Sequence, residues 1–154
     1  MKKINQKNFK KAMSKFPTGV TIVSINSDNN YIGKTVNSFA SLSLKPPLIL
    51  FSLDKKSSSI NQFVKAKFIG ISFLKKSQKK LSIHFAKKKC EWGHTKFFLS
   101  KNNIPLIKDS VINLECEKKI NHKEGDHIIF ICKVRYIESS SKKNAMIYYD
   151  NKYM

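Results

Sequence analysis

The chain has 154 residues, of which 41% are hydrophobic, so its length fits one ordinary domain. We therefore expect residues 1–154 to form a single domain rather than two. The most apolar run, at 48–53, is far shorter than the roughly 20 residues that a membrane-spanning helix needs. The basic start has no apolar segment after it, which excludes an ordinary secretory signal and predicts a cytoplasmic protein without a membrane partner.

The formal net charge of +20 raises the question of a nucleic-acid partner. Arg135 is the only arginine, although guanidinium groups are preferred for recognising bases and phosphates. The lysines are spread along the chain instead of forming one basic arm. We expect a solvated basic surface, with nucleic-acid binding unlikely as the main function.

Three cysteines are present, an odd number, and none forms a C-x-x-C pair. This spacing argues against a zinc site or a redox dithiol. Cys116 and Cys132 lie in apolar runs typical of strands, where cysteine acts as a small buried hydrophobe. Reduced thiols in the cytosol are the simplest interpretation.

The first half of the chain opens with apolar residues at helical spacing over 8–16, which predicts a short helix with one buried face. A β-branched strand at 20–25 and a polar turn follow, and 31–38 is expected to return as the second strand of a hairpin. Another strand is predicted at 48–53. A helix at 57–66 then has serines available for its N-terminal cap.

The second half begins with a strand at 67–74 and a short helix from Ser77. Two long β-type segments at 111–120 and 127–138 are joined by a turn that contains Gly125. About six strands and two or three short helices predict a mainly β protein, a β-barrel with peripheral short helices. Glu115 and Glu117 alternate with apolar neighbours, as expected for the solvent-facing side of a strand.

The five glycines lie too far apart for a dinucleotide-binding or P-loop motif, so other groups must bind any phosphate. The candidates are hydroxyl-rich segments: Thr35 to Ser38, Ser52, and the run of three serines at 57–59. A helix that starts with such a run offers free N–H groups and a positive dipole to a phosphate. The alternative is that these serines only cap a helix and close a turn.

His127 is the most interesting histidine because it follows Asp126 where a turn becomes a strand, a position that can direct an imidazole into a cleft. A turn histidine bonded to nearby backbone is an equally good interpretation. No histidine pair has metal-ligand spacing, so we expect no metal site. Trp92 and the aromatic residues near 97 and 148–153 could cover a planar ring, or could fill a core or a dimer interface.

Four segments, read in order, give the sequence a specific resemblance. They are FKKAMSKFPTGVTIVS, GKTVNSFASLSLKPPLILFSLDKKSS, QKKLSIHFA and LECEKKINHKEGDHIIFICKV. Together they resemble the flavin reductase-like FMN-binding family, which includes reductase components of two-component flavin monooxygenases. The resemblance runs from about Phe9 to the YYDNKY ending.

The resemblance implies a split β-barrel of the FMN-binding type and a homodimer. It also implies hydride transfer from NADH or NADPH to FMN or FAD, with diffusible reduced flavin serving a separate monooxygenase. It places His127 where the nicotinamide approaches. The residues that it places at the flavin are Thr35, Val36, Asn37, Ser38, Ser52, Leu53, Ser58, Ser59, Phe85, Ala86 and, as a cover, Tyr149.

The sequence departs from the family pattern at Asp54 and Lys55, where a small residue and an arginine are common, and in the basic loop at 87–95. Two other functions fit the same fold. One is a flavoprotein that retains FMN and reduces another substrate, and the other is a flavin-binding protein without turnover.

Overall fold

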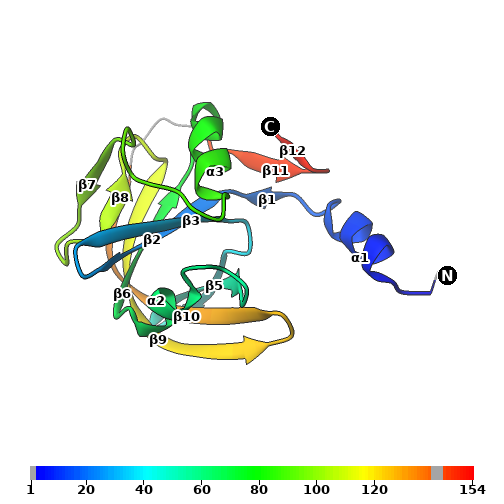
Figure 1. The fold of residues 1–154 in the computed structure, drawn as a ribbon, viewed down its shortest axis with the longest axis horizontal. Coiled ribbons are helices and arrows are strands. Elements are labelled where there is room, and N and C mark those ends of the chain that lie inside the picture. The colour runs from blue at the N-terminus through cyan, green and yellow to red at the C-terminus, as the bar shows by residue number, and fades with distance from the viewer. Residues whose placement is uncertain (1–2, 140–143) are drawn as a thin grey trace.

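The computed structural model describes residues 3–139 and 144–154, which form a mainly β protein with a few short helices (Figure 1). The helices are α1 (Gln6–Met13), α2 (Ile60–Lys65), α3 (Lys79–Phe85) and a 3₁₀ turn directly before α3 (Lys76–Gln78). No helix of these described ranges is long and apolar enough to cross a membrane.

The largest sheet is antiparallel and has seven strands in the order β3-β2-β6-β9-β10-β5-β4. Its strands are β2 (Thr21–Ser27), β3 (Asn30–Val36), β4 (Ala40–Leu44), β5 (Pro47–Asp54), β6 (Phe68–Phe73), β9 (Ile112–Glu124) and β10 (His127–Ser139). Among the described residues no ladder joins the edge strands β3 and β4, so this sheet is not closed. The expected β-rich class is therefore confirmed, whereas closure into a barrel is not seen.

Two smaller sheets complete the fold. Their strands are β1 (Thr18–Gly19), β11 (Ile147–Tyr149) and β12 (Lys152–Tyr153) in one, and β7 (Phe97–Leu99) and β8 (Pro105–Ile107) in the other. β1 pairs with β11, so the C-terminal hairpin lies beside the chain segment that enters β2. These short strands and β4 were not predicted from the sequence.

The predicted hairpins form where the turn chemistry indicated. Asp28 and Asn29 connect β2 to β3, and both adopt positive φ, as Asp and Asn tolerate in tight hairpin turns. Gly125, with φ of 52°, begins the two-residue turn between β9 and β10. Glycine is suited to this position because it has no Cβ to clash in the left-handed region.

The expectation that the first helix buries one face is wrong for this chain. Asn5 caps α1 by accepting a hydrogen bond from Asn8 N at 2.8 Å, but no residue of the helix is buried. The helix projects from the body of the molecule (Figure 1), and therefore Phe9 and Met13 are each more than half exposed. The apolar face exists as the spacing predicts, but nothing in the described chain covers it.

Two hydrophobic clusters lie on opposite sides of β2, because successive side chains of a strand point to opposite faces. Val23 and Ile25 belong to the larger cluster, which also contains the stacked rings of Phe51 and Phe130. Ile22 belongs to the second cluster, with residues of α3 and of the following loop. Burial of β2 on both faces explains its nearly continuous apolar sequence.

Glu115 does not face solvent as the alternating pattern predicted; it is only 2% exposed. Its carboxylate accepts hydrogen bonds from Ser100 Oγ, from Asn102 N at 3.0 Å and from the Asn102 amide. The loop between β7 and β8 thus covers this face of β9, and its donors replace the water that the carboxylate would otherwise need. Glu117 lies nearer the surface and pairs with Arg135.

Candidate flavin-binding cleft

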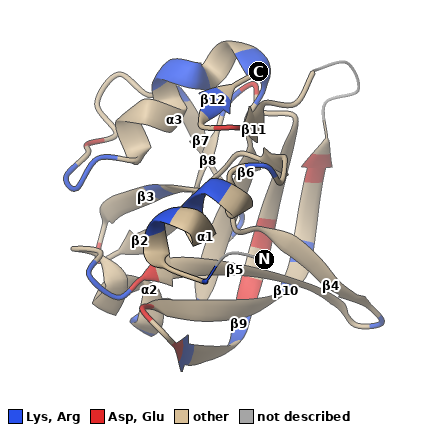
Figure 2. Ribbon diagram, turned by 90° about the vertical axis from the view of Figure 1, so that its right-hand side faces the viewer, with Lys and Arg blue, Asp and Glu red and all other residues tan. Residues whose placement is uncertain are grey.

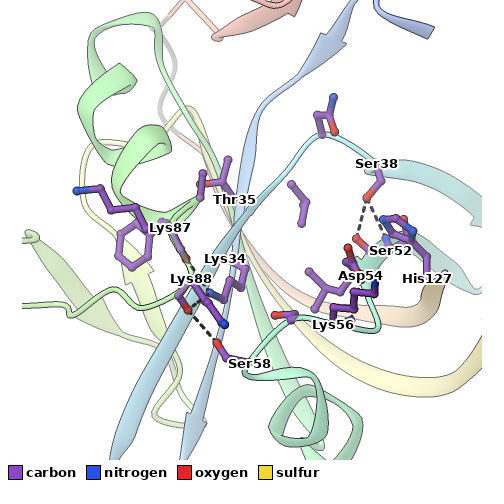
Figure 3. A pocket seen from close by; sticks show the side chains of 16 residues that line it. Lys34, Thr35, Ser38, Ser52, Asp54, Lys56, Ser58, Lys87, Lys88 and His127 are labelled. Atoms are coloured by element: carbon purple, nitrogen blue, oxygen red, sulfur yellow. Dashed lines mark hydrogen bonds between the residues drawn. The ribbon is translucent and has the colours of Figure 1, made fainter. Parts of the chain in front are cut away.

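An open cleft of about 510 Å³ lies between two walls, each of which includes strand ends of the main sheet. One wall is the end of β3 with the segment after it, together with the end of α3 and its loop. The other wall is formed by the end of β5, the turn after it and the start of β10 (Figure 3). The volume lies within the roughly 300–1,000 Å³ typical of small-molecule sites.

The cleft brings together ten of the twelve site residues expected from the sequence. Those that line it are Thr35, Val36, Asn37, Ser38, Ser52, Leu53, Ser58, Phe85, Ala86 and His127. Ser59 does not line it: this residue is 6% exposed and sits at the N-terminal cap of α2, with its hydroxyl 3.4 Å from that of Ser57. Tyr149 lies on β11, where Lys15 Nζ is 5.8 Å from its ring, and it does not line the cleft.

Hydroxyl groups hold the walls of the cleft in place. Ser38 Oγ donates to Ser52 O at 3.0 Å and accepts from Ser52 N at 2.9 Å, so it connects the segment after β3 to β5. Thr35 Oγ1 donates to Ser82 O at 2.7 Å and connects β3 to α3. These two side chains therefore fix the shape of the cleft through hydrogen bonds within the protein.

The loop after α3 is held against the cleft through its main chain. Lys34 Nζ donates to Lys87 O at 2.9 Å and to Lys88 O at 3.0 Å, while Ser58 Oγ donates to Lys88 O at 2.8 Å (Figure 3). One bond donor comes from β3 and the other from the turn before α2. The start of this loop therefore connects the two walls at one end of the cleft.

His127 lies at the opposite end of the cleft, at the start of β10 and directly across from Asp54 of β5. Its Nδ1 donates to Asp126 Oδ1 at 2.7 Å. This hydrogen bond holds the pKa of the Asp126 carboxyl below its ordinary value. It also makes Nδ1 the donor, so Nε2 of the neutral ring is an acceptor available to a ligand.

Close packing between β3 and α3 supports one wall of the cleft. A Cβ on Gly33 would lie 2.8 Å from two carbon atoms of the Phe85 ring, so only glycine lets β3 approach α3 this closely. Phe85 is fully buried and its ring packs at 4.9 Å, centroid to centroid, against Trp92. Trp92, Phe97, Tyr148 and Tyr153 join the second hydrophobic cluster, so for them the core interpretation is the one confirmed.

A smaller hollow of about 200 Å³ lies on another side of the segment from Thr35 to Asn37, which lines both spaces. Tyr148 and Tyr153 of the C-terminal hairpin complete this hollow. Ser82 Oγ donates to the Tyr153 hydroxyl at 3.0 Å, which fixes the hairpin to α3.

Four lysines at the cleft were not predicted from the sequence. Lys34, Lys56, Lys87 and Lys88 line it, and Asp54 is its single acidic lining residue. The four lysines come from three separate segments of the chain, so only the fold shows that they converge. Lys and Arg also recur on α1, on α3 and at several turns (Figure 2), in line with the dispersed charge of the sequence.

Lys55, one of the two departures from the family pattern, does not line the cleft. Its Nζ donates to Gly125 O at 2.6 Å, and its backbone N–H donates to Asp126 O at 2.9 Å. Both bonds hold the turn between β9 and β10 against the end of β5. Its amine is thus directed to that turn and not to the cleft.

Comparison with protein families gives a match to the flavin reductase like domain over residues 13–154. The chain belongs to this family. FMN reductase (NADH) SmoA of Agrobacterium fabrum is 35% identical over 130 residues, which is 84% of this chain and 75% of that protein. The predicted resemblance is therefore confirmed.

Two further family members show the same relationship. The reductase subunit HsaB of a flavin-dependent monooxygenase from Rhodococcus jostii is 25% identical over 151 residues, covering 97% of this chain and 77% of HsaB. The NADH:FAD oxidoreductase SgcE6 of Streptomyces globisporus, solved in complex with NAD and FAD fragments, superposes with a TM-score of 0.93. That structure is 27% identical, with 100% of this chain and 96% of that chain covered.

Proposed function

We propose that this protein is an NAD(P)H:flavin oxidoreductase that transfers hydride from a nicotinamide to FMN or FAD and supplies reduced flavin to a separate monooxygenase. The observation that carries the proposal is the cleft, in which ten of the expected residues converge in a member of the flavin reductase family. The NADH-dependent reductases among its relatives, and the monooxygenase subunit HsaB, support the donor and the destination of the flavin.

The cleft suits a flavin because it is open, of suitable volume, and lined by both hydroxyl and apolar groups. A bound flavin would itself accept the hydride, so the protein has to supply binding, orientation and electrostatics. Thr35 to Ser38, Ser52 and Leu53 would hold the ring system. His127 would contact the nicotinamide from the rim, with its ring oriented by Asp126.

This mechanism requires no acid–base pair and no metal. The cleft lining holds one carboxylate, Asp54, and one histidine, His127. Rate enhancement would come from holding two rings in contact, since positioning alone lowers a bimolecular barrier substantially.

We further propose that residues 1–154 act as one domain, a split barrel that functions as a homodimer in the cytoplasm. The uncovered apolar residues of α1, Phe9 and Met13, support a dimer because a second copy would remove them from water. The three cysteines are free thiols, as expected in a reducing compartment. Sedimentation as a monomer at micromolar concentration would contradict the dimer.

The function is tested by anaerobic stopped-flow absorbance of the protein with FMN, following the oxidised flavin band after addition of NADH or NADPH. Rapid bleaching, with reduced flavin passing through a filter that retains the protein, is the expected result. Bleaching with retention of the flavin would indicate a flavoprotein that reduces its own substrate. Flavin binding without bleaching by either donor would indicate a protein without turnover and would refute the proposal.

A further inference from the structure

The C-terminal hairpin, formed by β11 and β12, borders the segment Thr35–Asn37 from outside the cleft. Tyr148 and Tyr153 pair across this hairpin with ring centroids 5.2 Å apart, and both belong to the second hydrophobic cluster. Tyr153 is also held from α3 (Figure 1), because Ser82 Oγ donates to its hydroxyl at 3.0 Å. Ser82 is fully buried, so water does not compete for this bond. The hairpin is therefore fixed to α3 through one buried hydrogen bond.

Ser82 connects the hairpin to the lining of the cleft. Its hydroxyl donates to Tyr153, and its carbonyl oxygen accepts from Thr35 Oγ1 at 2.7 Å. The same carbonyl accepts from Ala86 N at 3.1 Å at the end of α3. Thr35 uses its single hydroxyl proton in the contact with Ser82, so the orientation of this hydroxyl is fixed. A series of hydrogen bonds thus runs from Tyr153 through Ser82 to Thr35, which lines the cleft.

These hydrogen bonds are important because close packing does not hold this segment on the side of the hairpin. The hollow of about 200 Å³ lies between the segment Thr35–Asn37 and the rings of Tyr148 and Tyr153. In a packed core, interdigitated side chains leave a segment little room to shift. Beside a hollow, that restraint is missing on one side. The position of Thr35 therefore depends strongly on its hydrogen bond to Ser82.

We propose, on the basis of the function proposed above, that Tyr153 and Ser82 are positioning residues for the bound flavin, which they orient through Thr35. Neither residue lines the cleft, so both act from outside the space that the flavin and the nicotinamide would share. Hydride transfer requires two rings in contact, and a misplacement of about 1 Å can slow such a reaction about a hundredfold. A small shift of Thr35 would therefore slow flavin reduction without unfolding the protein.

The first experiment compares Tyr153→Phe with its matched control, Tyr148→Phe. Each variant loses one phenolic hydroxyl beside the same hollow, but within the described chain the Tyr148 hydroxyl makes no hydrogen bond. In Tyr153→Phe, Ser82 Oγ can donate instead to the carbonyl of Gln78, four residues earlier, which keeps the fold but bends the helix. At saturating FMN and NADH, flavin reduction should be about tenfold slower in Tyr153→Phe and unchanged in Tyr148→Phe. FMN affinity should change much less than this rate.

A double-variant cycle separates positioning from a general effect on the fold. Thr35→Val keeps the shape of the side chain and removes the donor to Ser82 O. If Tyr153 acts through Thr35, Tyr153→Phe should slow flavin reduction by less than about twofold in the Thr35→Val background. Residues that contribute independently would give additive effects, and that result would overturn the proposal. Equal rates in Tyr153→Phe and Tyr148→Phe would also overturn it.

A measurement without nicotinamide keeps this proposal separate from the proposed function. The visible circular dichroism of bound, oxidised FMN reports how the protein holds the flavin ring. This band should change in Tyr153→Phe and remain as in the wild type in Tyr148→Phe. The same spectrum in both variants would overturn the positioning role. A changed band in Tyr153→Phe alone, without bleaching of the wild type by NADH or NADPH, would refute only the reductase function.

Discussion

Gly33 provides a quantitative test of how tightly β3 must lie against α3 for the cleft to form. In Gly33→Ala the new Cβ would be 2.8 Å from Cδ1 and Cε1 of Phe85 and 3.1 Å from Trp92. An ordinary contact begins at 3.4 Å, so β3 and the aromatic pair must separate by about 0.6 Å. Neither ring can move easily, because Phe85 is fully buried and Trp92 is 7% exposed.

Overpacking of this kind typically costs about 1–3 kcal/mol. Replacing glycine by alanine also stabilises by about 0.4–1 kcal/mol through the unfolded chain. We therefore expect Gly33→Ala to lower the free energy of unfolding by about 1–2 kcal/mol, or the Tm by about 2–8 °C for a chain of this length. Urea and thermal unfolding measure both quantities, and FMN affinity should fall as well because Phe85 lines the cleft.

The control is Gly93→Ala in the loop after α3, where an added Cβ would have no heavy atom within 4 Å. We expect this variant to be as stable as the wild type or slightly more stable. If Gly33→Ala and Gly93→Ala unfold at the same denaturant concentration, the close approach of β3 to α3 is not needed for stability, and this reasoning fails.

Four other outcomes are expected. Glu115→Gln should lower the free energy of unfolding by about 2–3 kcal/mol, because its amide group replaces one of the buried acceptor oxygens by a donor. An unchanged midpoint of urea unfolding would contradict this prediction. His127→Ala should reduce kcat/KM for NADH about tenfold while FMN affinity stays constant, and an equal loss of both would contradict its role at the nicotinamide. The pKa of Asp126 is lower in the folded protein than in the unfolded chain. Its carboxylate should therefore stabilise the fold above about pH 4, and this stabilisation should disappear as the pH falls through the folded-state pKa. Asp126→Asn should therefore be less stable than wild type at pH 6 but not at the acid end of a urea series. Burial raises the pKa of the Cys90 thiol, and it raises the pKa of the Cys116 and Cys132 thiols further. Iodoacetamide should therefore label only Cys90 in the native protein, and this labelling should be slow.

The long strands and hairpins were predictable because their signals are local. The run of β-branched residues in β2 and the turn residues Asn29 and Gly125 each specify a conformation within a few residues. The short strands were not predictable in this way. β1 has two residues and pairs with β11 more than a hundred positions later, so its conformation depends on tertiary contacts.

For the cleft, too, features with a local sequence signal were predictable, and features that depend on tertiary contacts were not. Residues near Thr35 and Ser52 were expected at a site both from their hydroxyl-rich segments and from the family motifs, and they line one cleft. The burial of Glu115 depends on a loop that folds over β9, and alternation alone cannot show such a cover. Lys34, Lys56 and Lys88 come from three different segments, and their convergence required the fold.

The anchoring of the loop after α3 has a consequence for how this protein can diversify. Lys34 and Ser58 bind the loop through the carbonyl oxygens of positions 87 and 88, and every amino acid has a carbonyl oxygen. Side chains at these two positions can therefore be exchanged while the loop keeps its place. A library that varies only positions 87 and 88 should yield folded proteins with altered ligand preference, which makes this loop a natural starting point for engineering selectivity.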